Sequence, residues 1–133
     1  MVAVPVGNIN GVLPSGQLLL NSKVDLIFPI SDNTINASFE ALGRLANDNG
    51  IPLFGGFPLF TLQGACAAMG WDFFEMGYKA GEIAVRVRDG EEARGIPIQS
   101  MSRVRLHLNL DAAKRQGVKF SSQVLGRADD ITR

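Results

Sequence analysis

The sequence has few of the residues on which disulfide frameworks, metal centres and nucleophilic catalysis depend. It contains one cysteine, Cys66, and one histidine, His107. A single cysteine excludes an internal disulfide and a cysteine-based zinc site, and a lone histidine is a poor basis for any other zinc site. Cys66 lies among alanines, which is typical of a small buried hydrophobe, and nothing brings it together with His107 and an activating third group. We therefore expect no metal, no cofactor and no covalent catalysis.

The chain also lacks an excess of one charge and any long apolar run. Its 13 basic and 13 acidic residues give a formal net charge of zero, and its basic runs are no longer than two residues. This balance argues against a nucleic acid or an anionic membrane surface as a partner. Its apolar runs fall well short of the roughly 20 residues that a membrane-spanning helix needs. The start, MVAVPVGNING, lacks the features of a signal peptide, so we expect a cytoplasmic chain unless it is a piece of a longer protein.

What the sequence does contain is a succession of short apolar runs and helical patterns. We expect strands at residues 2–6, 24–30, 51–54, 65–71 and 103–110, and helices at 17–21, 35–49, 72–89 and 111–117. The run at 24–30 has no alternation, which is typical of a parallel strand covered on both faces. Pro14 and Gly16 are expected to prevent a longer first helix. This order predicts an α/β fold, with a mostly parallel sheet and helices on both of its faces.

Ligands of such sheets bind beyond the carboxyl ends of the strands, where we expect the loops 31–34, 55–57 and 70–72 to converge. The first loop, Ser31, Asp32, Asn33 and Thr34, offers hydroxyls, an amide, a carboxylate and backbone N–H groups, which suit a ligand with a carboxylate or an ammonium group. Capping of the next helix explains the same residue types. One cap needs only one such residue, so both interpretations stay open.

The other two loops also have a structural and a functional interpretation. Asp72 is expected to cap a helix with Glu75 in a capping box, and the same carboxylate can face the cleft. Gly55 and Gly56 match no phosphate-binding motif, so close packing or a turn is the expected role. Phe57 and Phe60 fall in a predicted loop, where core packing is the usual explanation and a ligand wall or a subunit contact is the alternative.

Three longer stretches together resemble the C-terminal part of the TrpX-like substrate-binding proteins of ABC transporters, which have a periplasmic-binding type I-like fold. They are VDLIFPISDNTINASFEALGRLANDNGIPLF, GACAAMGWDFFEMGYKAGEIAVRVRDGEEARGIPIQ and LHLNLDAAKRQGV. The resemblance covers about residues 2–130. It implies a protein of two α/β lobes around a cleft that captures small solutes, aromatic amino acids among them, and delivers them to an ABC permease. It also implies a periplasmic or extracellular lipoprotein without enzymatic activity.

The resemblance maps the family's cleft loop onto Asp32, Asn33 and Thr34, and its Gly-x-Asp motif onto residues 70–72. Together with the strand-end argument, it gives a predicted ligand site of Ser31, Asp32, Asn33, Thr34, Gly56, Phe57 and Asp72. The segment 57–60 is a departure, because the family often has acidic residues there. A polar contact to the ligand is then lost, and the ligand differs or is absent.

The resemblance also implies that this chain lacks a first lobe and the opening strand and helix of the second. Residues 1–102 would form an incomplete C-terminal lobe, and residues 103–133 a crossover strand and a helical tail. A missing central strand exposes a strand edge and an apolar surface, so we expect the chain to form homo-oligomers or to rearrange with 104–110 as a substitute strand. Two alternatives remain: a self-associating fragment without ligand, and a small α/β enzyme with Asp32 as acid or base. The enzyme is disfavoured because a second catalytic partner is lacking.

Overall fold

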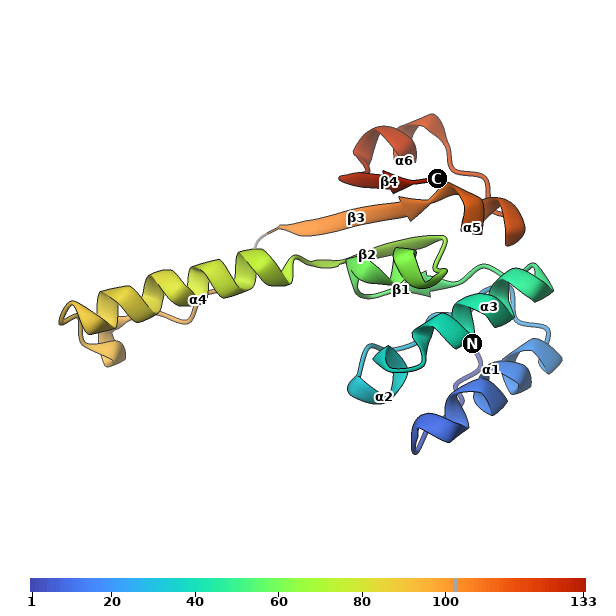
Figure 1. The fold of residues 1–133 in the computed structure, drawn as a ribbon, viewed down its shortest axis with the longest axis horizontal. Coiled ribbons are helices and arrows are strands. Elements are labelled where there is room, and N and C mark those ends of the chain that lie inside the picture. Colours follow the sequence, from blue (N-terminus) through green and yellow to red (C-terminus); the bar gives the residue numbers. More distant parts are fainter. Residues whose placement is uncertain (102) are drawn as a thin grey trace.

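The sheet has four strands in the order β1-β2-β3-β4 (Figure 1). The computed structural model describes residues 1–101 and 103–133. The strands are β1 (Phe54–Gly55), β2 (Ala67–Trp71), β3 (Val104–Asn109) and β4 (Asp130–Thr132). β1 pairs with β2 in parallel, β3 runs antiparallel to β2, and β4 is parallel to β3. An isolated parallel bridge between Ile27 and Leu53 places residues 24–30 beside the start of β1. The predicted α/β class is confirmed.

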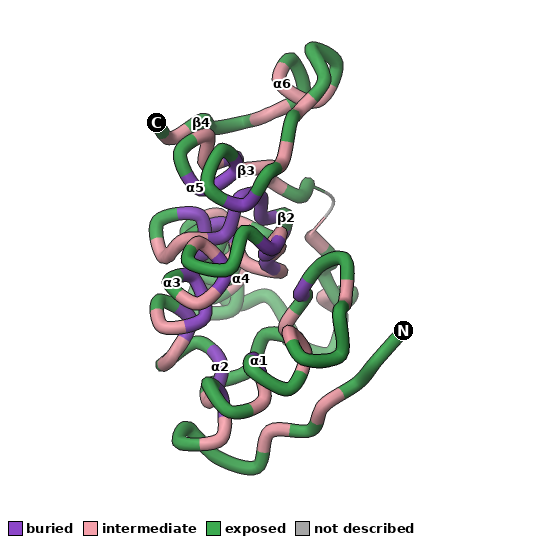
Figure 2. Tube along the Cα trace, turned by 90° about the vertical axis from the view of Figure 1, so that its right-hand side faces the viewer, coloured by how far each residue is buried: buried purple, intermediate pink, exposed green. Residues whose placement is uncertain are grey.

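Helices cover both faces of this sheet, as predicted. They are α1 (Val12–Asn21), α2 (Asn33–Asn36), α3 (Phe39–Asn49), α4 (Phe73–Arg88), α5 (Leu110–Arg115) and α6 (Ser122–Arg127), with short 3-10 turns η1 (Ile9–Gly11), η2 (Pro58–Gln63) and η3 (Ala93–Gly95). The larger core joins α1, α3 and η2 to one face through residues such as Val12, Phe39, Leu53 and Phe60. The smaller core packs Ala112 and Ala113 of α5 against Cys66 on the other face. Buried residues gather where these elements meet (Figure 2).

The expected helix at 35–49 is two helices. α2 ends at Asn36, and α3 begins at Phe39 after Ala37 and Ser38. The apolar spacing that suggested one helix is still satisfied, because Ile35 of α2 and Phe39, Leu42 and Ala46 of α3 all enter the larger core. α3 ends as predicted at Gly50, whose φ of 62° is a left-handed conformation that glycine adopts without strain.

The first helix is longer than predicted, and the expected strand at 2–6 is absent. Pro14 lies in the first turn of α1, where its missing N–H is not needed for the helix. Gly16 faces α3 so closely that an added Cβ would lie 2.6 Å from Cδ2 of Leu45. The glycine therefore serves packing between two helices and does not break one. Residues 2–6 form no strand and are mostly exposed.

The run at 24–30 is covered on one face only, which corrects the prediction of a strand buried on both. Ile27 is 4% exposed, whereas Leu26, Phe28 and Ile30 are 47%, 58% and 81% exposed. Ile27 is thus the one buried residue of this run, and its apolar neighbours Leu26 and Phe28 are exposed. Met69 and Trp71 of β2 are also more than half exposed. The exposed apolar surface that the resemblance led us to expect is therefore present.

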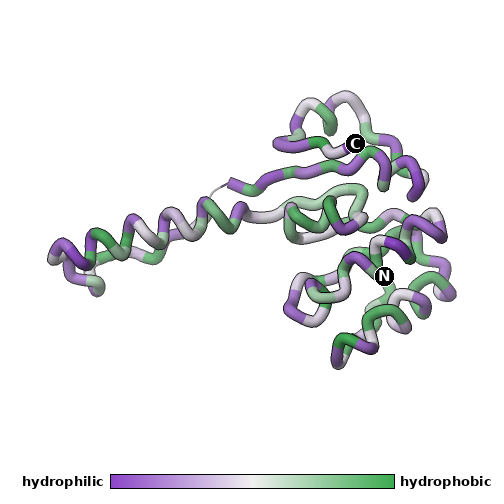
Figure 3. The backbone as a smooth tube through the Cα atoms, in the orientation of Figure 1, coloured by the Kyte–Doolittle hydropathy of each residue, from purple (hydrophilic) through white to green (hydrophobic). Residues whose placement is uncertain are grey.

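α4 projects away from the sheet and its covering helices (Figure 1), and apolar and polar residues alternate along it (Figure 3). Asp72 caps it as predicted, since Oδ1 accepts from the backbone N–H groups of Phe74 at 2.9 Å and Glu75 at 3.3 Å. The second hydrogen bond of a capping box, in which the Glu75 carboxylate accepts from the backbone N–H of Asp72, is absent among the described residues. Across those residues, too, no helix is both long and apolar enough to cross a membrane.

A buried amide joins the C-terminal part of the chain to the rest. Gln116, 1% exposed, accepts a hydrogen bond from Leu53 N at 2.9 Å. Its Nε2 donates to Asn47 Oδ1 at 2.8 Å and to the carbonyl of Gly64 at 2.7 Å. One side chain at the end of α5 thus satisfies polar groups of α3, the strand segment before β1 and the turn before β2.

We predict that Gln116→Leu lowers the free energy of unfolding by about 2–4 kcal/mol, because it leaves the buried N–H of Leu53 and the carbonyl of Gly64 without their partner. Urea denaturation followed by circular dichroism measures the change. Gln17→Leu, at an exposed position of α1, is the matched control and should have little effect. Equal stabilities of the two variants would contradict this role of Gln116.

Asp129, which directly precedes the last strand, forms hydrogen bonds with residues in and next to β3. Its Oδ2 accepts from Leu106 N at 2.9 Å, and its Oδ1 from Arg103 at 2.7 Å and Arg105 at 3.4 Å. The backbone N–H of Leu106, followed by Arg103, lowers the pKa of this carboxyl. β4, which was not predicted, follows directly and pairs with β3.

We predict that Asp129→Asn speeds hydrogen exchange of the β4 amides at neutral pH. Because the folded-state pKa is lowered, the stabilising contribution is present above the ordinary carboxyl pKa and is lost as pH falls through the lowered value. Wild type and variant should therefore converge in acid. Asp48→Asn, at an exposed position of α3 away from β4, is the control. Identical exchange of wild type and Asp129→Asn at neutral pH would rule out the fastening role.

Candidate functional site

The predicted strand-end loops meet at one edge of the sheet. A Cβ added to Gly56 would lie 3.1 Å from Oγ of Ser31, so the first two loops are in contact. A Cβ added to Gly70 would collide with the carbonyl of Gly56 and lie 3.2 Å from the Pro58 ring, so the third loop is in contact with the second. Glycines at 56 and 70 permit this approach. The edge thus carries backbone groups and side chains from all three loops.

Capping accounts for only one of the four polar residues at the start of α2. Asp32 Oδ1 accepts from Ile35 N at 2.8 Å, and the Asp32 residue is otherwise exposed. The side chains of Ser31, Asn33 and Thr34 take part in no hydrogen bond with other described residues. Ser31 and Asn33 are exposed, and Thr34 is half-buried. Polar groups at this edge therefore remain available to a ligand.

The two loop phenylalanines have different roles. Phe60 is 2% exposed and stacks on Phe39 with ring centroids 3.7 Å apart, so it is a core residue and offers no surface to a subunit partner. Phe57 is half-buried, with its ring edge-on to Phe60 at 5.5 Å and to Phe73 at 4.8 Å. Phe57 thus joins the core to the first turn of α4 and leaves part of its surface at the loop edge.

Arg105 lies beside Asp72 and was not predicted as a site residue. Its Nε is 3.7 Å from Asp72 Oδ2, too long for a hydrogen bond, and this buried nitrogen has no hydrogen-bond partner among the described residues. Arg105 is also the direct partner of Gly70 in the β2–β3 ladder, which places it next to the third loop. The alternation of residues 103–110 indicated its face, but only the register of β3 against β2 puts it at this edge.

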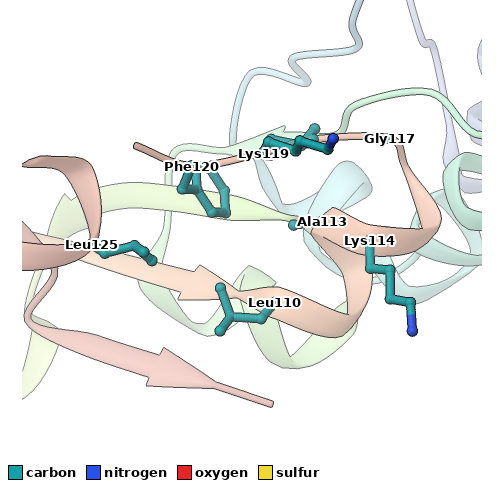
Figure 4. Close-up of a pocket in the computed structure, with 8 residues that line it drawn as sticks. Leu110, Ala113, Lys114, Gly117, Lys119, Phe120 and Leu125 are labelled. Carbon is teal, nitrogen blue, oxygen red and sulfur yellow. The ribbon is translucent and has the colours of Figure 1, made fainter. Parts of the chain in front are cut away.

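Cavities formed by the described residues lie away from this edge. One, of about 280 Å³, is lined by residues of α5, α6 and the segment between them, including Leu110, Phe120 and Leu125 (Figure 4). The other, of about 240 Å³, lies among α3, η2 and α5 and carries Glu40, Arg44 and Arg115. Neither is lined by a predicted site residue. Among the residues that the structure describes, no group of His, Cys, Asp and Glu side chains could hold a metal ion.

Comparison with known proteins shows to which family the chain belongs. The family model described as "ABC transporter substrate binding protein" matches residues 4–132. The chain belongs to this family. It is a family of solute-binding proteins and not of enzymes, so the enzyme alternative is set aside. A curated relative, the "Tyrosine-binding protein" of Clostridioides difficile strain R20291, is 33% identical over 95 residues, which are 71% of this chain and 28% of the relative.

Solved structures have the same fold. A conserved domain protein from Vibrio cholerae has a TM-score of 0.87 and 25% identity over 98% of this chain and 44% of its own. The ABC domain in complex with L-Trp from Streptococcus pneumonia has a TM-score of 0.81 and 23% identity, over 95% of this chain and 43% of its own. The chain thus spans less than half the length of these proteins, as the resemblance implied.

Proposed function

We propose that this chain provides one wall of the solute site in the binding component of an ABC importer, and that the solute is an amino acid, with an aromatic one favoured. Family membership and the 33% identity to a protein named for tyrosine binding support the proposal. In this proposal, residues 1–102 are the incomplete C-terminal lobe, and residues 103–133 are the crossover strand and tail. The complete protein acts in the periplasm or outside the cell as a lipoprotein and delivers its solute to an ABC permease.

The chemistry of the edge suits a zwitterion with an apolar side chain. Asp32 has Oδ2 free of the cap and can accept from an ammonium group, while Asn33 and Thr34 can donate to a carboxylate. Arg105 adds a cation next to Asp72. Phe57 offers the aromatic surface, where the family often has acidic residues. The observation that carries the proposal is the set of unpaired polar side chains at 31, 33 and 34.

The proposed mechanism is closure of two lobes around the solute without chemical change. A cleft normally buries most of the surface of its ligand, and this chain supplies one wall. Binding by this chain alone is therefore expected to be weak, with the same preference for amino acids.

We predict that the chain shows a thermal shift with L-tyrosine or L-tryptophan and none with glucose. Asn33→Ala and Thr34→Val should each raise the amino-acid concentration that gives half of the maximal shift by roughly tenfold, because each removes a hydrogen bond to a charged group. Asn36→Ala, exposed at the end of α2, is the matched control. Asp32 is left intact because it caps α2. A shift that is equal in all variants, or no shift with any amino acid, would contradict the proposal.

A second candidate is a fragment that binds no solute and self-associates. The exposed apolar residues Leu26, Phe28 and Ile30 beside β1 favour it. Light scattering during size-exclusion chromatography separates the two: a homo-oligomer that Phe28→Ser dissociates supports self-association through this surface. A monomer at all concentrations counts against it.

A further inference from the structure

The cavity of about 280 Å³ between α5 and α6, here called the α5–α6 cavity, takes no part in the candidate solute site. Its walls come from α5, from α6 and from the segment that joins the two helices. Leu110, Phe120 and Leu125 point toward one another across it (Figure 4). All three are half-buried, so the cavity is open to solvent and a small ligand can reach it.

The turn after α5 forms one side of this cavity. Gly117 has a φ of 72°, a left-handed conformation that favours glycine, and it turns the chain back beside the helix. Val118 N donates to the carbonyl of Ala113 at 2.7 Å, which holds the returning segment against α5. Val118 and Phe120 then pack against the smaller core around Cys66. Hydrogen bonds and core packing thus fix this wall of the cavity.

The lining of the α5–α6 cavity combines apolar walls with positive charge at the rim. The larger apolar side chains are Leu110, Val118, Phe120 and Leu125. The charged residues are Lys114 and Lys119, both exposed, and neither forms an ion pair with a described residue. No acidic residue is among the described residues that line the cavity. This combination suits a ligand with an apolar body and one negatively charged end.

Backbone donors for a negatively charged group are also available on the returning segment. The N–H groups of Lys119 and Phe120 donate to no described residue. The last carbonyls of α5, which would repel an anion, already accept from the backbone N–H groups of Gly117 and Val118. Both the side chains and the backbone of this segment therefore favour an anionic group at the rim.

We propose that the α5–α6 cavity binds a small monocarboxylate with an apolar chain, of the kind that a medium-chain fatty acid provides. The chain packs on Leu110, Phe120 and Leu125, and the carboxylate lies in water beside the two lysines. The volume of about 280 Å³ is just below the range of roughly 300–1,000 Å³ that is usual for ligand pockets, which favours a short chain over a complete phospholipid. The apolar walls equally disfavour a free inorganic anion.

The same chemistry disfavours an amino acid in this cavity. The ammonium group of a zwitterion would face Lys114 and Lys119 and would find no carboxylate among the described lining residues. Binding at the α5–α6 cavity is therefore independent of the solute site at the sheet edge, and either can fail without the other.

The test is a two-dimensional NMR titration of the isotope-labelled chain with sodium octanoate. We expect saturable shifts of the amides in residues 110–125. Butanoate, which has a shorter chain, should bind more weakly by roughly tenfold or more, because each buried methylene contributes roughly a factor of four to the affinity. Octan-1-ol has the octanoate chain without the charge and serves as the neutral ligand.

A variant with both Lys114→Gln and Lys119→Gln separates the charge from the walls. It should raise the half-saturating octanoate concentration by roughly tenfold and leave that of octan-1-ol unchanged, because it removes two charges and keeps the apolar lining. The matched control combines Lys23→Gln with Lys79→Gln, which changes the net charge equally at positions that do not line the cavity. This control should bind octanoate like the wild type.

Equal octanoate affinities of the wild type and the Lys114/Lys119 variant would overturn the proposed carboxylate site. Shifts that do not saturate, or that spread over exposed apolar residues such as Phe28 and Phe74, would show non-specific adsorption and overturn it as well. The absence of shifts in residues 110–125 would have the same consequence. No amino acid enters the titration, so these outcomes are distinguishable from failure of the proposed function.

Discussion

The packing of Phe60 holds together the parts of the chain that form the candidate site. Its ring stacks on Phe39 of α3 at 3.7 Å between centroids and meets the edge of Phe57 at 5.5 Å. Gly55 of β1 lies against the same ring, where an added Cβ would be 2.7 Å from Phe60 Cδ2. Phe57 in turn contacts Phe73 at the start of α4. One buried ring thus links the core to the loop 55–57 and to the direction in which α4 leaves the sheet.

This packing places two exposed features of the molecule at the same edge of the sheet. The polar loops at residues 31–34 and 70–72 and the apolar face of α4 diverge from one edge of the sheet. An amino acid bound at the loops would be held on one side only, and α4 has a face to bury. In the proposed function, a second lobe that closes around the solute supplies the wall opposite these loops.

Much of this followed from local sequence patterns. Asp72 and Gly50 mark helix ends because capping and left-handed φ depend on one or two residues. The alternation of 103–110 gave β3, and the strand-end rule gave the meeting of Ser31 and Gly56. The features that the sequence analysis predicted wrongly or missed depend on residues that are distant in the sequence. Gly16 is explained by Leu45 of α3, the uncovered face at Phe28 by the absence of a covering element among the described residues, and Arg105 by its register against Gly70. Residue type alone carries none of these.

The central claim is that the sheet edge, and not either cavity, binds the solute. The most direct measurement is a two-dimensional NMR titration of the isotope-labelled chain with L-tyrosine and L-tryptophan. The account predicts progressive shifts of the amides at 31–34, 56–57 and 72, with little change around Leu110, Phe120 and Leu125. Shifts confined to the cavity between α5 and α6, or none at the three loops with either amino acid, would contradict it.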